Sequence, residues 1–158
     1  MYPELQALIH QAEYSYLQSE NLESLSAHVT GLQAKLKVYK LIRDKEIDIF
    51  QPVADKLLEK MSGVAQKDLE TSLQHWLLIM RYASMAMLLN NPEFLERRLL
   101  EWLTDIVTVR QSREIDQAVY DSLLAQLAKV LPAPSGLEYI KPFLSQAKNY
   151  LINDQVTV

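Results

Sequence analysis

The sequence contains no cysteine. Without a thiol the chain can form no disulfide, offers no thiolate nucleophile or thiolate zinc ligand, and cannot hold a prosthetic group through a thioether bond. A reducing compartment puts such a chain at no disadvantage, so we expect a cytoplasmic protein. Glycine is also scarce, with 3 residues among 158, and the sequence has no glycine-rich loop of the kind that cradles phosphate groups.

Strong positive charge and long apolar runs are missing too. The chain has 16 lysines and arginines against 20 acidic residues, and its basic residues are spread out, which argues against a nucleic-acid partner. The most apolar stretch, residues 76–89, contains Arg81 and is shorter than the roughly 20 residues that span a bilayer. The N-terminus lacks the basic start and apolar core of a signal peptide. We therefore expect no nucleic-acid partner and no integral membrane segment.

Signatures of catalysis and metal binding are absent as well. No nucleophile stands with a base at a recognisable spacing, and no cluster of histidines and carboxylates suggests a metal site. The three histidines, at positions 10, 28 and 75, all lie in the first half of the chain, whereas a haem ligand would be expected in the later helices. We therefore expect neither an enzyme nor a metal or haem protein.

Apolar residues at helical spacing are what the chain has in abundance. No segment shows the period of two that is typical of strands, so the sequence predicts an all-α protein. Spacing and capping signals place the helices as follows: residues 4–17; 22 to about 43; one capped by Asp48, with Pro52 in its first turn; a long one capped by Asp68; one capped by Asn91; one capped by Ser112; and a last one over 140–152, after a turn.

The second of these helices carries a continuous apolar seam. Its members are spaced alternately by four and three residues, and they are Leu22, Leu25, Val29, Leu32, Leu36 and Tyr39. A seam of this kind packs against a partner element. We therefore expect an N-terminal hairpin of two helices with an apolar side available to a partner.

Residues 81–103, RYASMAMLLNNPEFLERRLLEWL, carry a family resemblance. A long apolar helix is cut by Asn90-Asn91-Pro92 and restarts at once, and this layout resembles the phycobiliproteins, the bilin-carrying light-harvesting proteins of cyanobacteria, such as the allophycocyanin and phycocyanin subunits. The residues that follow the family's pattern without a gap are Arg81, Tyr82, Ala86, Leu88, Pro92, Leu95, Glu96 and Leu99. The resemblance implies a globin-like phycobiliprotein fold in one domain over 1–158, with a helical hairpin at 1–33 and the globin-like core at 34–158.

The same resemblance implies that the pigment site has degenerated. The family attaches its bilin through a cysteine nine residues before the arginine of this stretch, and Ser72 stands there. An arginine that pairs with a bilin propionate is replaced by Gln74, and an aspartate that accepts the pyrrole N–H bonds is replaced by His75. A neutral amide cannot make the charge-assisted contact that a propionate favours. We expect no covalent bilin; Gln74 and His75 are then ordinary polar residues on a core helix.

For assembly, the resemblance implies something positive. Family subunits join as antiparallel pairs, the hairpin of one against the core of the other, and an acidic residue of the first helix pairs with the arginine that opens the matching stretch. Glu13 and Arg81 stand at those two positions. The apolar surface for the same contact would come from Leu5, Leu8, Ile9, Leu25, Val29 and Leu32. The alternative is that the hairpin folds back on its own core.

Together these features favour an unpigmented phycobiliprotein-like interaction protein, associated with the thylakoid-bound phycobilisome in its assembly, regulation or turnover. Its partner would be a phycobiliprotein subunit or a second copy of itself. The first alternative is a carrier that binds a tetrapyrrole or another apolar ligand without a covalent bond. The second is a globin-like stress-sensor module, which would require an output domain.

Overall fold

The computed structural model describes residues 2–153, and every secondary-structure element among them is a helix. The elements are α1 (Pro3–Ala12), α2 (Ser19–Asp44), α3 (Glu46–Lys60), α4 (Gln66–Leu89), α5 (Pro92–Leu95), the π-helical turn η1 (Glu96–Leu100), α6 (Glu101–Arg110), α7 (Arg113–Val130), α8 (Gly136–Lys148) and the π-helical turn η2 (Asn149–Asn153). The predicted all-α class is confirmed. None of these helices is both long and apolar enough to cross a membrane.

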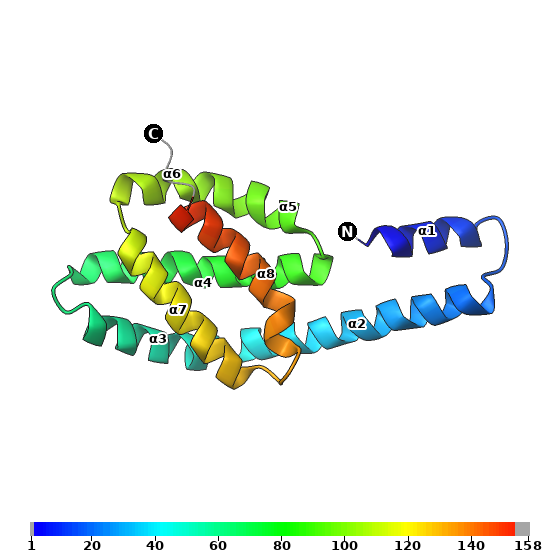
Figure 1. Cartoon of the computed structure of the whole chain (residues 1–158), viewed down its shortest axis with the longest axis horizontal. Coiled ribbons are helices and arrows are strands. Elements are labelled where there is room, and N and C mark those ends of the chain that lie inside the picture. The colour runs from blue at the N-terminus through cyan, green and yellow to red at the C-terminus, as the bar shows by residue number, and fades with distance from the viewer. Residues whose placement is uncertain (1, 154–158) are drawn as a thin grey trace.

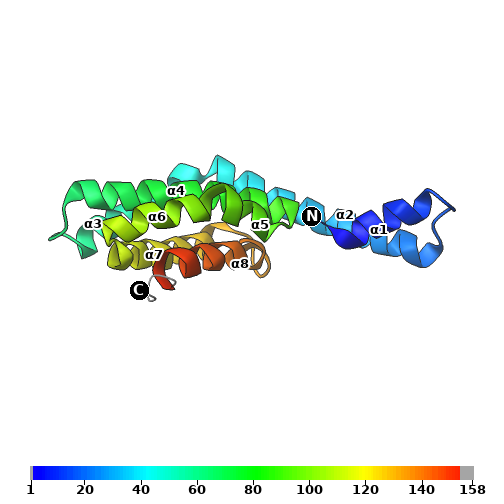
Figure 2. The same ribbon diagram turned by 90° about the horizontal axis from the view of Figure 1, so that it is seen from above.

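The molecule has two parts, a core and a hairpin that projects from it (Figure 1). Helices α1 and α2 form the hairpin, and in the view from above they extend well beyond the packed helices of the core (Figure 2). Helix α2 runs without a break from the tip of the hairpin into the core, so residues 33 and 34, the expected boundary, lie inside one helix. The predicted N-terminal hairpin is confirmed, and it does not fold back on its own core.

The base of the hairpin is tied to the core by the first described residue. The hydroxyl of Tyr2 donates a hydrogen bond to the carbonyl oxygen of Leu88, at 2.8 Å, near the end of α4. The ammonium group of Lys35, on α2, lies 5.3 Å from the centre of the Tyr2 ring. Tyr2 therefore connects the start of α1 with both α2 and α4.

Helix α4 forms the centre of the core and packs against α2, α3, α7 and α8. Large side chains along it are fully buried, including Trp76, Ile79, Met80 and Met87. Burying a large apolar side chain stabilises a fold by about 1.5–3 kcal/mol, so this one helix supplies much of the driving force for folding. Leu73 and Leu77, on the side of α4 nearer α3, are only partly buried.

The break between α4 and α5 has the geometry that the sequence predicted. Asn90 ends α4 in the left-handed conformation, with a φ of 48° that asparagine tolerates better than most residues. The side chain of Asn91 caps α5 by accepting a hydrogen bond from the backbone N–H of Phe94, at 3.2 Å. Pro92 occupies the first helical position, where its missing N–H is not needed. The predicted cap at Asn91 is confirmed.

Several other predicted helix limits are wrong. Helix α1 ends at Ala12 instead of residue 17. Asp48 and Asp68 do not precede their helices but lie in the first turns of α3 and α4, where a carboxylate still interacts favourably with the helix dipole. Ser112 does precede α7, yet its side chain makes no capping bond. Capping and the helix dipole both favour aspartate, so the sequence alone does not show whether an aspartate precedes a helix or lies in its first turn.

The predicted turn before the last helix is also wrong, because α8 begins at Gly136 and contains Pro142. A proline inside a helix costs about 3 kcal/mol or more, but the helix buries Ile140, Phe143 and Leu144 at about 1.5–3 kcal/mol each. Burial therefore outweighs the lost hydrogen bond. Gly136 permits this early start, since a Cβ there would lie only 2.9 Å from Cδ of Pro132.

We expect the substitution Asn91→Ala to lower the free energy of unfolding by about 1 kcal/mol, because it removes the cap of α5. Urea unfolding followed by circular dichroism measures this change. The control is Asn91→Asp, which keeps an acceptor for the N–H of Phe94 and should change stability much less. An alanine variant as stable as the wild type would show that the cap contributes nothing.

Candidate functional site

Helix α4 carries all three positions that the sequence predicts as a degenerate pigment site, but it does not turn them toward one cavity. Ser72 is buried, and its hydroxyl has no hydrogen-bond partner. His75 is half-buried on a neighbouring part of the helix surface, whereas Gln74 is exposed and lines a groove between α3 and α4. Successive helical residues are rotated by about 100°, which places Gln74 about 200° around the axis from Ser72. These side chains do not form a common ligand site.

Trp76, the residue after His75, makes a buried polar contact that the sequence did not predict. Asp116, on α7, is buried, and its carboxylate accepts hydrogen bonds from the indole N–H of Trp76 at 3.2 Å and from the hydroxyl of Ser112 at 2.7 Å. A buried tryptophan requires an acceptor for its N–H, and a buried carboxylate requires donors. From the sequence one could expect Trp76 to require an acceptor, but no pattern identified Asp116 as that acceptor.

Charged groups from two helices influence His75. Burial lowers the pKa of His75 and the positive charge of Arg110 lowers it further, while the negative charge of Asp116 acts in the opposite direction. Arg110, at the end of α6, donates a hydrogen bond to the backbone carbonyl of Asp68, at 3.1 Å, at the start of α4. His75 thus lies between charged groups of α6 and α7, and its buried Nδ1 has no hydrogen-bond partner.

Arg81, the arginine expected at an interface, makes a two-pronged ion pair within its own chain. Its Nε donates to one carboxylate oxygen of Glu46 at 2.7 Å, and its Nη2 donates to the other at 2.5 Å. The Glu46 side chain is 25% exposed and that of Arg81 is 56% exposed. The hydrogen bonds from Arg81 hold the pKa of Glu46 below its usual value. No sequence signal pointed to Glu46, because the pair joins residues 35 positions apart.

Glu13 lies far from Arg81 in the single chain. It follows the last residue of α1, at the end of the hairpin remote from α4 (Figure 1). Its carboxylate lies 3.2 Å from Nδ1 of His10, and both side chains are largely exposed. The pairing of Glu13 with Arg81 concerns two chains, so it stays a prediction.

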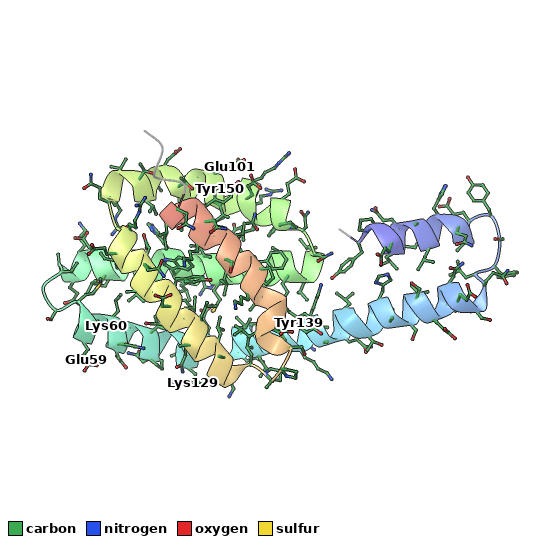
Figure 3. The ribbon with its side chains drawn as sticks, viewed as in Figure 1. Glu59, Lys60, Glu101, Lys129, Tyr139 and Tyr150 are labelled. Atoms are coloured by element: carbon green, nitrogen blue, oxygen red, sulfur yellow. The ribbon has the colours of Figure 1, made fainter. Side chains whose placement is uncertain are left out.

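The six apolar residues expected at the interface divide into two groups. Leu8 is buried, and Leu5 and Leu25 are partly buried, so these three help to hold α1 against α2. Ile9, Val29 and Leu32 remain exposed, at 57%, 48% and 40%. Figure 3 shows side chains filling the interior of the core, whereas no core helix lies beside the side chains of α1 and the first part of α2. The hairpin therefore presents apolar side chains that its own core does not cover.

Two hollows flank the pair formed by Arg81 and Glu46. One is a mainly apolar groove of about 260 Å³ between α3 and α4, and its lining residues are Glu46, Ile47, Phe50, Gln51, Ala54, Leu73, Gln74 and Leu77. The other is a cavity of about 330 Å³ on the α2 side, lined by Tyr39, Ile42, Arg43, Glu46, Arg81 and Ser84. The sequence analysis missed this surface. Ile47, at the edge of the groove, is 77% exposed.

Comparison with known families gives one match. The family model described as "Phycobilisome protein" matches residues 8–109, from the first helix of the hairpin to the end of α6. This range contains Glu13, Glu46, Ser72 and Arg81. No curated protein matches the chain.

The lowered pKa of His75 predicts a loss of stability in mild acid. The folded state disfavours the protonated imidazole, so unfolding takes up a proton, and stability falls as the pH drops below about 6.5. We expect His75→Gln to make the decline in unfolding free energy between pH 7 and pH 5 shallower, as measured by urea titrations. His10→Gln, at an exposed site, is the control. Equal slopes for His75→Gln and wild type would contradict the prediction.

Proposed function

Because the chain belongs to the phycobilisome protein family, we propose that it is an unpigmented phycobiliprotein-like interaction protein that acts at the phycobilisome. The family is all-helical and globin-like, and its members are light-harvesting structural proteins rather than enzymes. They assemble as oligomers with other subunits. The proposed partner is a phycobiliprotein subunit or a second copy of this chain, in the cytoplasm at the thylakoid surface, and the proposed role is in assembly, regulation or turnover of the complex.

The proposal that the protein carries no covalent bilin is supported by three features. The sequence offers no cysteine for a thioether bond. Ser72, at the attachment position, is buried within the packed core, where a pigment could not reach it without displacing neighbouring side chains. Gln74, at the propionate-binding position, is uncharged and lies on another side of α4.

The exposed apolar hairpin is the observation that carries the interaction proposal. Three large apolar side chains expected at an interface, Ile9, Val29 and Leu32, are exposed on an element that stands away from the core. On the core, the mainly apolar groove between α3 and α4 is bordered by Glu46, the ion-pair partner of Arg81. We infer an antiparallel pair in which the hairpin of one subunit packs on the core of the other. In that pair Glu13 approaches Arg81.

A second candidate function, non-covalent carriage of an apolar ligand, is supported by the same groove. Its lining includes Phe50, Leu73 and Leu77, which could contact a hydrocarbon or a ring system. Its volume of about 260 Å³ falls just below the roughly 300–1,000 Å³ of most small-molecule sites. Absorbance of the purified protein after addition of bilin or haem separates the two candidates.

We expect both Glu13→Ala and Arg81→Ala to weaken association. If the pair is desolvated at the interface, loss of one partner costs about 3–5 kcal/mol, whereas an exposed pair contributes about 0–1 kcal/mol. Sedimentation velocity at micromolar concentration measures the shift, for the chain alone or, if it is monomeric, for its complex with a phycocyanin subunit. Arg97→Ala, which breaks an exposed pair with Glu93, is the control. Unchanged association of both test variants would remove the proposed interface.

We expect the protein to stay colourless when it is produced in a host that makes phycocyanobilin. Ser72→Cys alone should attach little pigment, because the new thiol is buried and Gln74 and His75 remain. Visible absorbance after denaturation detects covalent pigment, and a phycocyanin subunit produced in the same host is the positive control. Strong bilin absorbance that survives denaturation of the wild-type protein would overturn this proposal.

A further inference from the structure

The arginine proposed to receive a partner's carboxylate already holds one. Both carboxylate oxygens of Glu46 accept hydrogen bonds from Arg81, through Nε at 2.7 Å and Nη2 at 2.5 Å. A planar guanidinium binds a carboxylate best in this two-pronged geometry. In the single chain, therefore, the side of the guanidinium that is best suited to a carboxylate is occupied.

We propose that Glu46 is an intrachain latch on Arg81, and that Glu13 of the docking hairpin replaces it when subunits associate. This inference rests on the docking mode proposed above. If Glu46 stayed in place, an incoming Glu13 would meet a second negative charge at the same guanidinium, and like charges in contact oppose binding. Exchange of one carboxylate for the other removes that repulsion.

The surroundings of Glu46 provide for its release. It is the first residue of α3, where unpaired backbone N–H groups and the helix dipole stabilise a carboxylate without help from Arg81. Its side chain also borders both hollows, so it can move without displacing packed residues. Arg43, which pairs with Asp44 at 2.7 Å, lines the cavity on the α2 side and adds positive charge to it. The latch can therefore open without leaving a buried charge unpaired.

The latch bears on which occupant the docking surface accepts, and the occupant we infer is a second copy of this chain. Its Glu13 competes with Glu46 for the same guanidinium, so the ion pair of Arg81 that docking breaks is formed again between the two copies. A hairpin with a neutral residue at that position does not displace Glu46, so Arg81 stays paired within its own chain and adds nothing to association.

The test is Glu46→Gln, which keeps the size of the side chain and removes its charge. We expect association to become roughly two- to fivefold tighter, because exposed ion pairs change an equilibrium by about that factor. Sedimentation velocity over a concentration series gives the dissociation constant for self-association of the chain. Asp48→Asn is the matched control, since it removes the same charge from the same exposed first turn of α3.

Nuclear magnetic resonance gives a direct view of the exchange. The Nε–H signal of Arg81 should move on Glu46→Gln in the unassociated chain, and it should return toward the wild-type position when the associated state forms. Glu13→Ala in the docking hairpin should abolish that return. Circular dichroism confirms that each variant keeps its helical fold.

The outcomes separate the latch from the docking mode. If Arg81→Ala weakens association but Glu46→Gln leaves it unchanged or weakens it, the docking mode stands and the latch is wrong. If Asp48→Asn tightens association as much as Glu46→Gln, the effect is one of net charge and the latch is again wrong. If Arg81→Ala and Glu13→Ala both leave association unchanged, or no association occurs, the docking mode fails and the latch fails with it.

Discussion

The buried indole of Trp76 sets the constraint on which the rest of the core depends. Its ring lies in the middle of α4, and its N–H reaches Asp116 on α7 at 3.2 Å. Burying an unpaired N–H or carboxylate costs free energy, and the hydrogen bond between the two groups offsets this cost for both. The hydroxyl of Ser112 donates a further bond to Asp116, and the ring of Tyr120 packs against Trp76 with centroids 5.6 Å apart. The relative positions of α4 and α7 are thereby fixed.

The region around Ser72 and His75, the positions predicted to have lost the pigment, is held by contacts within the chain. Arg110 bonds to the carbonyl of Asp68, and His75 lies half-buried between the charges of Arg110 and Asp116. Tyr150 of η2, labelled in Figure 3, donates a hydrogen bond to Glu96 of η1. The helices are therefore held by their own polar side chains.

The sequence predicted the fold better than it predicted the site, for a physical reason. Helical periodicity and the Asn91-Pro92 restart are local signals, and they led to the correct class, hairpin and central helix. The limits of α3, α4 and α8 were missed, because dipole interactions and burial at Ile140 overrode the local rules. Asp116 and Glu46 act through partners 40 and 35 residues away, and no local pattern encodes such pairs. Helix geometry alone places Ser72 and Gln74 on different sides of α4. Only the structure shows that the side with Ser72 is the buried one.

The single hydrogen bond from Tyr2 to Leu88 has a mechanical consequence. Helix α2 has 26 residues, and the part from its start at Ser19 to Lys35, beside Tyr2, is about 24 Å long at 1.5 Å per residue, so this part is a lever arm. By simple geometry, a tilt of several degrees at its root would sweep the tip sideways by about 2–3 Å, enough to miss a hydrogen bond. Tyr2, fastened to α4 and covered by Lys35, is a strut that resists this tilt. The contacts of Tyr2 therefore determine how firmly the projecting part of α2 is held.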